Sequence, residues 1–430
     1  MNLEAVALWL GRLLMAGFAA LVLLELPRYF KTALAEPIER RDAERERLPW
    51  KRLLGEVLIA YAASRFLVAL ACGASYAVQN QTLEGFFSAF ADKLRPWDAD
   101  HYLGIIENWY VTEGDPRLHI VFLPFYPALC RALRWATGMS AFAAAEVVSN
   151  AALIGCGMAM YRLVEADGDA AIARRAMLLT LFSPMTYFYS IPYTESVFLL
   201  VTLLAVLCAR GRRWALSVLF GAMAANTRIV GMAVAIPIFW EMLRADREAA
   251  QARGLADSPR TVARRLALCA LRVLPVSAGL LLYMCGNYRL YGNPTQFLIF
   301  QREHWSQSFG SMANTFRYSL CNAVSYDDPL YQLGVWAPQA LLLIAVPLAL
   351  VWRRRREPAP DIAYLLVFHY VSFAPTWLLS GPRYLSAAYA VYPLLARIPK
   401  GKRGFAALLA GECALLAYMT VIGLWYGKVY

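Results

Sequence analysis

The chain has 430 residues, of which 60% are hydrophobic and only 17% are charged, and its mean hydropathy is +0.44. This composition excludes an ordinary soluble enzyme and favours helices that lie in lipid. The net charge of +12 would suggest nucleic acid in a soluble protein, but here the basic residues stand in short segments between apolar runs, where they report membrane topology. We therefore expect membrane lipids, and no nucleic acid, as partners.

Repeated apolar runs predict an all-α polytopic membrane protein that forms a single domain over residues 1–430. We expect about twelve transmembrane helices, although several runs are shorter than the roughly 20 residues that a full crossing needs, so that adjacent runs can form broken or tilted helices. The predicted spans are residues 5–26, 53–76, 141–163, 174–190, 196–209, 214–227, 229–243, 266–286, 336–352, 361–379, 385–398 and 404–425.

The basic segments all fall on one face when these spans are threaded alternately through a membrane, and the positive-inside rule makes that face cytoplasmic. They are residues 28–52, 174–175, 210–213, 244–265, 353–356 and 400–403. Residues 1–52 are interpreted as an extra N-terminal helix followed by a basic cytoplasmic loop.

The opposite, outer face receives two long segments, 77–140 and 287–335. Their aromatic residues, prolines and isolated charges indicate short loop helices that carry the chemistry of the protein. We expect an integral membrane protein with its site on that face. The face is periplasmic if the membrane is a bacterial cytoplasmic membrane, and luminal if it is the endoplasmic reticulum.

The first motif of the outer face is "WDADHYLGI", residues 97–105. Asp98 and His101 are three residues apart and share one face of a helix, whereas Asp100 points away. A carboxylate at the edge of a bilayer can serve as a base when it is desolvated, or stay ionised beside a cation. The alternative is that Asp98 only caps the helix that begins near Ala99.

Two isolated arginines, Arg228 in "NTR" and Arg383 in "SGPRY", stand beside apolar runs on the face where basic residues are scarce. Such a position implies an anionic partner. The partner can be a phosphate held by the guanidinium fork or, as the structural alternative, an ion pair with Glu195 or Asp98. Glu195 follows Tyr193 in "SIPYTES" at a helix start, where the helix dipole already favours a carboxylate.

The segment "FQREHW", residues 300–305, adds Gln301 and His304 to the polar residues of the outer face. A metal site could be built from His101, His304 and the aspartates, but neither an H-x-x-x-H nor a C-x-x-C spacing supports one. We therefore expect no metal and no other cofactor. His119 is interpreted as a loop residue, and His369 as a satisfied intramembrane histidine.

The motifs, in their order along the chain, resemble those of the second GPI mannosyltransferase family, which comprises the PIG-V family and its prokaryotic relatives. Those that carry the resemblance are "WDADHYLGI", "FLPFYP", "SIPYTES", "NTR", "FQREHW" and "SGPRYLSAAY". The resemblance implies a GT-C glycosyltransferase bundle and a polyprenyl- or dolichyl-phosphate-mannose donor. It also implies inverting transfer of mannose to a hydroxyl of a lipid-linked or glycan acceptor on the non-cytoplasmic face.

The resemblance further implies that Asp98 is the general base and His101 its companion. The residues that it places at the donor phosphate or sugar are Arg228, Arg383, His304, Gln301 and Tyr384. Those expected at the acceptor, or in the scaffold of the site, are Asp100, Glu195, Tyr193 and Trp97. Ile229 and Val230 stand where the family pattern is more polar.

The alternative function is a polytopic lipid or sugar transporter or flippase. A transporter is expected to carry charges near the middle of its spans and to consist of two related halves. Here the unusual polar residues gather on one face and no internal repeat is visible, which favours an enzyme. A structural subunit of a larger membrane complex would not need the clustered motifs.

Overall fold

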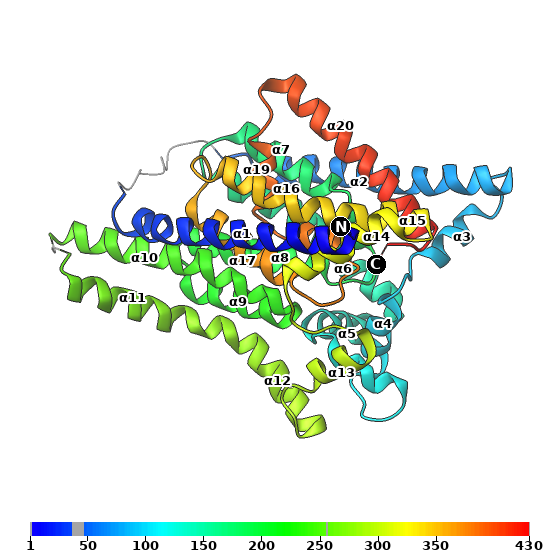
Figure 1. Ribbon diagram of the computed structural model, residues 1–430, viewed down its shortest axis with the longest axis horizontal. Coiled ribbons are helices and arrows are strands. Elements are labelled where there is room, and N and C mark those ends of the chain that lie inside the picture. Colours follow the sequence, from blue (N-terminus) through cyan, green and yellow to red (C-terminus); the bar gives the residue numbers. More distant parts are fainter. Residues whose placement is uncertain (1, 37–46, 255–256, 430) are drawn as a thin grey trace.

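The computed structural model describes residues 2–36, 47–254 and 257–429, and these form an all-helical protein (Figure 1). Within these ranges no β-strand occurs, and the pairing of Phe309 with Pro375 is an isolated bridge. The predicted all-α membrane class is confirmed. Among the described residues, six helical segments are long and apolar enough to cross a membrane, which does not confirm the count of about twelve. They are Leu3–Leu34, Trp50–Asn80, Ala141–Glu165, Pro259–Tyr291, Pro329–Arg353 and Gly401–Trp425.

The count differs because several of the predicted spans are short helices beside 3-10 turns. The turn η2 (Thr186–Ser190) precedes α8 (Glu195–Arg210), and η3 (Ile229–Val234) separates α9 (Trp214–Thr227) from α10 (Ala235–Ala252). With 16 residues, α8 is roughly 24 Å long, which is less than the thickness of the hydrocarbon core. Short apolar runs therefore form parts of broken crossings.

The centre of the molecule is built from α6 (Ala141–Glu165), α7 (Ala170–Phe182) and α8, and α9 packs on α8. Gly157 of α6 lets its neighbours come close, because a Cβ there would lie 3.1 Å from the side chain of Val57. Further elements of the bundle are α2 (Trp50–Asn80), α11 (Pro259–Val273), η4 (Leu274–Ser277), α12 (Ala278–Tyr291), α15 (Pro329–Tyr331), η5 (Gln332–Trp336), α16 (Ala337–Arg353), α18 (Gly381–Ser386), α19 (Val391–Ala396), α20 (Gly401–Thr420) and η6 (Val421–Trp425).

The N-terminal helix α1 (Leu3–Leu34) packs along α14 (Met312–Ser325) and also contacts α17 (Ala359–Phe373) (Figure 1). Gly11 allows this approach, because a Cβ there would lie 2.6 Å from the carbonyl oxygen of Ala313. The helix that was interpreted as an extra element is thus packed into the bundle.

Short helices gather at one end of the bundle (Figure 1). Four of them come from residues 77–140, and they are α3 (Phe86–Lys93), α4 (Ala99–Asn108), η1 (Asp115–Val121) and α5 (Phe125–Thr137). A fifth, α13 (Gln296–Trp305), comes from the second outer segment and contacts η1. In Figure 1, α3 lies at the right and α4, α5 and α13 lie at the lower right. This end of the bundle carries the candidate site.

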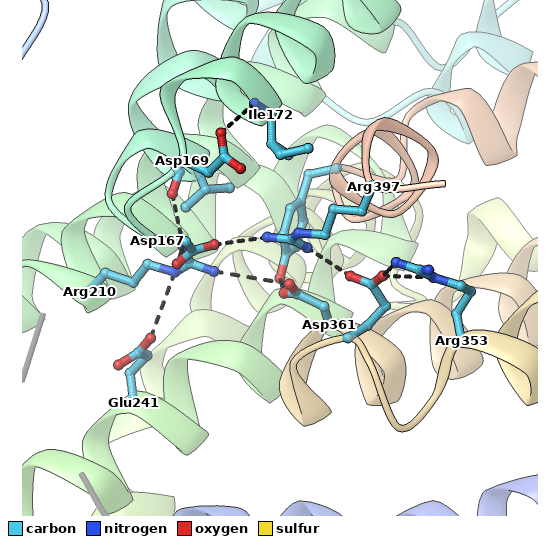
Figure 2. Close-up of polar contacts among 11 residues, drawn as sticks. Asp167, Asp169, Ile172, Arg210, Glu241, Arg353, Asp361 and Arg397 are labelled. Carbon is cyan, nitrogen blue, oxygen red and sulfur yellow. Dashed lines mark hydrogen bonds and ion pairs between the residues drawn. The ribbon is translucent and has the colours of Figure 1, made fainter. Parts of the chain in front are cut away.

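The opposite end of α8 is held by a network of ion pairs (Figure 2). Arg210, the last residue of α8, lies 2.8 Å from Asp167 and 4.0 Å from Asp361, which is in the first turn of α17. Arg397 extends the network, with distances of 3.1 Å to Asp167 and 2.7 Å to Glu357. Removing one partner of a buried ion pair is strongly destabilising, so the network fastens α8 to α17 far from the short helices.

Candidate active site

A cavity of about 830 Å³ opens among the short helices. Its wall is formed by the start of α4, by η1 and α13, by the break between α9 and η3, and by α18. Five charged side chains stand among aromatic and aliphatic ones on this wall. They are Asp98, Glu195, Arg228, Arg302 and Arg383.

Asp98 lies on the cavity wall immediately before α4. Its carboxylate makes no capping hydrogen bond, and its Oδ2 lies 3.5 Å from Nη2 of Arg383. The backbone N–H of Asp98 donates to the Tyr193 hydroxyl at 3.0 Å, and that hydroxyl donates to the carbonyl of Pro96 at 2.8 Å. Trp97 has a φ of 50°, a left-handed conformation that costs about 1–3 kcal/mol. The side chain of Asp98 therefore forms an ion pair from a constrained turn instead of capping the helix.

Glu195 joins the two isolated arginines. It begins α8 and is only 1% exposed. Its Oε1 lies 2.5 Å from Nη1 of Arg228 and 3.3 Å from Nε of Arg383. A buried carboxylate needs cationic partners, and here two guanidinium groups share one. The ion-pair alternative for Arg228 and Arg383 is thus realised in the structure.

Arg383 stays charged and keeps an unsatisfied donor in spite of these ion pairs. Burial by itself lowers the pKa of Arg383, but the negative field of Glu195 raises it well above its ordinary value, so the guanidinium stays charged. The side chain is 5% exposed, and its Nη1 has no hydrogen-bond partner among the described residues. A buried charged donor without a partner is costly. Arg383 thus places a buried positive charge with an unsatisfied donor at the cavity wall.

His101 lines the cavity from the first turn of α4. Its ring stacks on Phe122 with the centroids 5.1 Å apart, and His119 of η1 meets it edge-on at 5.3 Å. Burial, and then the neighbouring His101, lower the pKa of His119. Gly104 makes room for this pair, because a Cβ there would lie 2.6 Å from Cε1 of His119. His119, interpreted from the sequence as a loop residue, is the partner of His101.

Helix α13 turns one face to the cavity. Leu298, Gln301, Arg302 and Trp305 line it at helical spacing. His304 is exposed and is not part of the wall. The structure thus brings Gln301 to the cavity wall, leaves His304 outside it, and adds Arg302, which sequence reasoning missed.

Of the other predicted site residues, three line the cavity and one lies outside its wall. Trp97, Tyr193 and Tyr384 line the cavity, and the guanidinium carbon of Arg228 lies 4.5 Å from the ring centre of Tyr384. Asp100 is exposed and is not part of the wall. No group of three or more His, Cys, Asp or Glu side chains suited to a metal ion occurs in the part of the chain that the structure describes.

Arg65 of α2 holds the turn that precedes Glu195. It donates to the carbonyl of Thr186 at 2.8 Å and to the hydroxyl of Ser190 at 2.6 Å, so both ends of η2 are fixed. Sequence reasoning passed over Arg65. Its signal is visible, because a lone arginine inside an apolar run needs polar partners within the protein.

Gln339 of α16 plays the corresponding part for the turn that precedes Arg383. Its side-chain oxygen accepts the N–H of Gly381 at 3.3 Å, and its amide donates to the carbonyl of Leu378 at 3.2 Å. Gly381 fits closely against this scaffold, because a Cβ there would lie 2.7 Å from the ring of Phe373. The position of Arg383 is therefore set by packing that no motif reveals.

Comparisons with known proteins gave a likeness of fold and no family. Neither the models of protein families nor the curated proteins contain a match. Among solved structures, the chain is similar to the archaeal oligosaccharyltransferase AglB from Archaeoglobus fulgidus in complex with an inhibitory peptide and a dolichol-phosphate (TM-score 0.44, 13% identity, 89% of this chain and 56% of that chain). It is also similar to the apo form of the Archaeoglobus fulgidus oligosaccharyltransferase (TM-score 0.41, 12% identity, 88% of this chain and 57% of that chain). The chain spans little more than half the length of these proteins, and such values assign no activity.

The fold and the site together define a class of protein. It is a polytopic helical membrane protein with a charged, aromatic-lined cavity among the short helices at one end of its bundle. The residues of the cavity wall decide which reaction this class of protein can carry out here.

Proposed function

We propose that this protein is an integral-membrane glycosyltransferase of the GT-C type. It transfers mannose from polyprenyl- or dolichyl-phosphate-mannose to a hydroxyl of a lipid-linked or glycan acceptor, with inversion. The observation that supports this most directly is the pairing of Asp98 with Arg383 on the wall of one cavity. The choice of mannose rests on the resemblance of the motifs, and the proposed site faces the periplasm or the lumen.

The reaction needs a base at the acceptor hydroxyl and positive charge at the leaving phosphate. Asp98 takes the hydroxyl proton while the acceptor oxygen bonds to the anomeric carbon of the sugar. The bond from that carbon to the phosphate oxygen breaks, and its electron pair leaves with the lipid phosphate. Arg383, whose side chain lines the cavity, stabilises the departing phosphate, and Arg228 supplies a second cation beside Glu195. Guanidinium groups can carry this charge stabilisation without a metal.

A lipid-borne donor agrees with the apolar part of the cavity wall. Phe309 and Leu298 line the cavity and are nevertheless 70% and 49% exposed. Large apolar side chains exposed in a membrane protein contact lipid at little cost. The prenyl chain can lie against them while the sugar phosphate reaches Arg383.

A transporter or flippase would also use a charged cavity, and one comparison separates the two functions. The protein in lipid nanodiscs is incubated with polyprenyl-phosphate-mannose and a panel of lipid and glycan acceptors, and the products are identified by mass spectrometry. We expect transfer by the wild type. A transporter would move the lipid across a vesicle bilayer and form no glycosidic bond.

The base is tested with Asp98→Asn, and Asp100→Asn is the matched control, because Asp100 is exposed and outside the cavity wall. General base catalysis contributes roughly 10²- to 10⁴-fold, so Asp98→Asn should lose transfer by about that factor while the control stays near the wild type. Substantial transfer by folded, membrane-inserted Asp98→Asn would rule out the base role.

A further inference from the structure

The charges on the cavity wall do not balance. Two carboxylates, Asp98 and Glu195, face three guanidinium groups, so the wall carries one positive charge in excess. Arg228 and Arg383 are accounted for by the ion pairs with the two carboxylates. The surplus cation is Arg302.

Arg302 is placed to meet a ligand. It belongs to the face of α13 that lines the cavity, it is exposed, and it forms no ion pair or hydrogen bond with the other described residues. Its neighbours Gln301 and Trp305 line the same wall. Their side chains are a hydrogen-bonding amide and an indole, which suit a phosphate and a sugar ring.

We infer that Arg302 is a specificity-determining residue that matches the cavity to a donor with one negative charge. This inference rests on the proposed function. A lipid joined to a sugar by a single phosphodiester carries one charge, and with it the cavity is neutral. A diphosphate link carries two and leaves one negative charge without a cation on the wall, in the same cavity as the carboxylates of Asp98 and Glu195, and like charges repel. The cavity therefore favours monophosphate-linked over diphosphate-linked sugar donors.

The position of Arg302 also defines which kinetic step it affects. Because it is exposed and its partner is the incoming phosphate, it acts on capture of the donor. Arg383, buried beside Asp98, acts on bond breaking. Loss of Arg302 should therefore weaken donor binding about tenfold, the equivalent of one charge-assisted hydrogen bond, and change kcat far less. Added salt should reduce the difference.

The test measures binding without transfer. Displacement of a fluorescent farnesyl-phosphate-mannose from the full-length protein in phosphatidylcholine nanodiscs is followed with farnesyl-phosphate-mannose and farnesyl-diphosphate-mannose as competitors. Arg302→Gln is compared with Arg289→Gln, which removes the same charge from an exposed residue of α12 outside the cavity wall. Arg302→Lys keeps the charge, and Gln307→Lys adds a cation to the wall.

We expect the wild type, Arg289→Gln and Arg302→Lys to prefer the monophosphate, Arg302→Gln to bind it about tenfold more weakly, and Gln307→Lys to shift the preference toward the diphosphate. Equal binding of both competitors by the wild type, or unchanged binding by Arg302→Gln, would overturn the inference. If the protein transfers mannose but Arg302→Gln binds the donor as the wild type does, this inference is wrong and the proposed function stands. If binding depends on Arg302 but no transfer occurs, the proposed function is wrong and the role of Arg302 in binding stands.

Discussion

Glu195 is the residue whose neutralisation tests the organisation of the site most severely. Glu195→Gln keeps the shape of the side chain and removes the charge that Arg228 and Arg383 share. Because Glu195 is only 1% exposed, solvent cannot compensate for the loss of that charge. Breaking a buried ion pair by removal of one partner costs about 3–5 kcal/mol. Because Arg383 keeps Asp98 at 3.5 Å, most of this cost comes from the guanidinium of Arg228. We expect a loss of about 3–5 kcal/mol in the free energy of unfolding.

The assay is reversible unfolding by sodium dodecyl sulfate in mixed micelles, followed by tryptophan fluorescence. The double variant Glu195→Gln/Arg228→Gln should be more stable than the sum of the single effects predicts, because the second substitution removes the charge that the first left unpaired. Dodecyl phosphate should stabilise Glu195→Gln more than the wild type, because its phosphate supplies the missing negative charge. A free energy of unfolding within about 1 kcal/mol of the wild type would refute the reasoning.

Two more predictions concern the surroundings of the site. Gly381→Ala places a methyl group 2.7 Å from Phe373 and 2.8 Å from the side-chain oxygen of Gln339. It should cost about 1–3 kcal/mol of unfolding free energy and weaken donor binding through Arg383. Gly411→Ala, whose methyl group meets no atom within 4 Å, is the control, and equal losses in both would contradict the packing argument. For His119, burial and then His101 lower its pKa, so below its ordinary pKa of about 6.5 the unfolded chain binds more protons. The stability of the neutral ring is present above about pH 6.5 and is lost as the pH falls through the lower, folded-state pKa. The unfolding free energy should fall less between pH 7.5 and pH 5 in His119→Gln than in the wild type, and identical pH curves would exclude this role.

The sequence was sufficient to predict that Asp98, Glu195, Arg228 and Arg383 belong together. Each stands beside an apolar run, and alternate threading places all of these positions on one face. The choice between a phosphate ligand and ion pairs could not be made, because it depends on distances of 2.5–3.5 Å that tertiary packing sets. The structure contains the ion pairs and still leaves the buried Nη1 of Arg383 without a hydrogen-bond partner among the described residues.

The residues of α13 show how a motif can point to a residue that lies beside the cavity wall and not on it. The resemblance drew attention to His304, whereas the 3.6-residue period of the helix carries Leu298, Arg302 and Trp305 to the cavity. A helix that begins at Gln296 could not be located from an apolar pattern alone, because the run also contains polar residues. Without the helix boundaries the phase of the segment was undetermined.

The helix breaks are what connect the fold to the site. Glu195 follows η2, Arg228 lies between α9 and η3, and Arg383 lies in the short helix α18. Irregular backbone at membrane depth is tolerated only where protein covers it or where it lines a polar cavity. At η2 and at α18 both conditions are met, because Arg65 and Gln339 satisfy backbone groups behind the turns while Glu195 and Arg383 line the cavity. At the third break, Arg228 lines the same cavity. Apolar runs too short to span a membrane, each with one charged residue at its end, are therefore a signal of a buried site in the sequence. In this chain they lead to Glu195, Arg228 and Arg383 on the cavity wall.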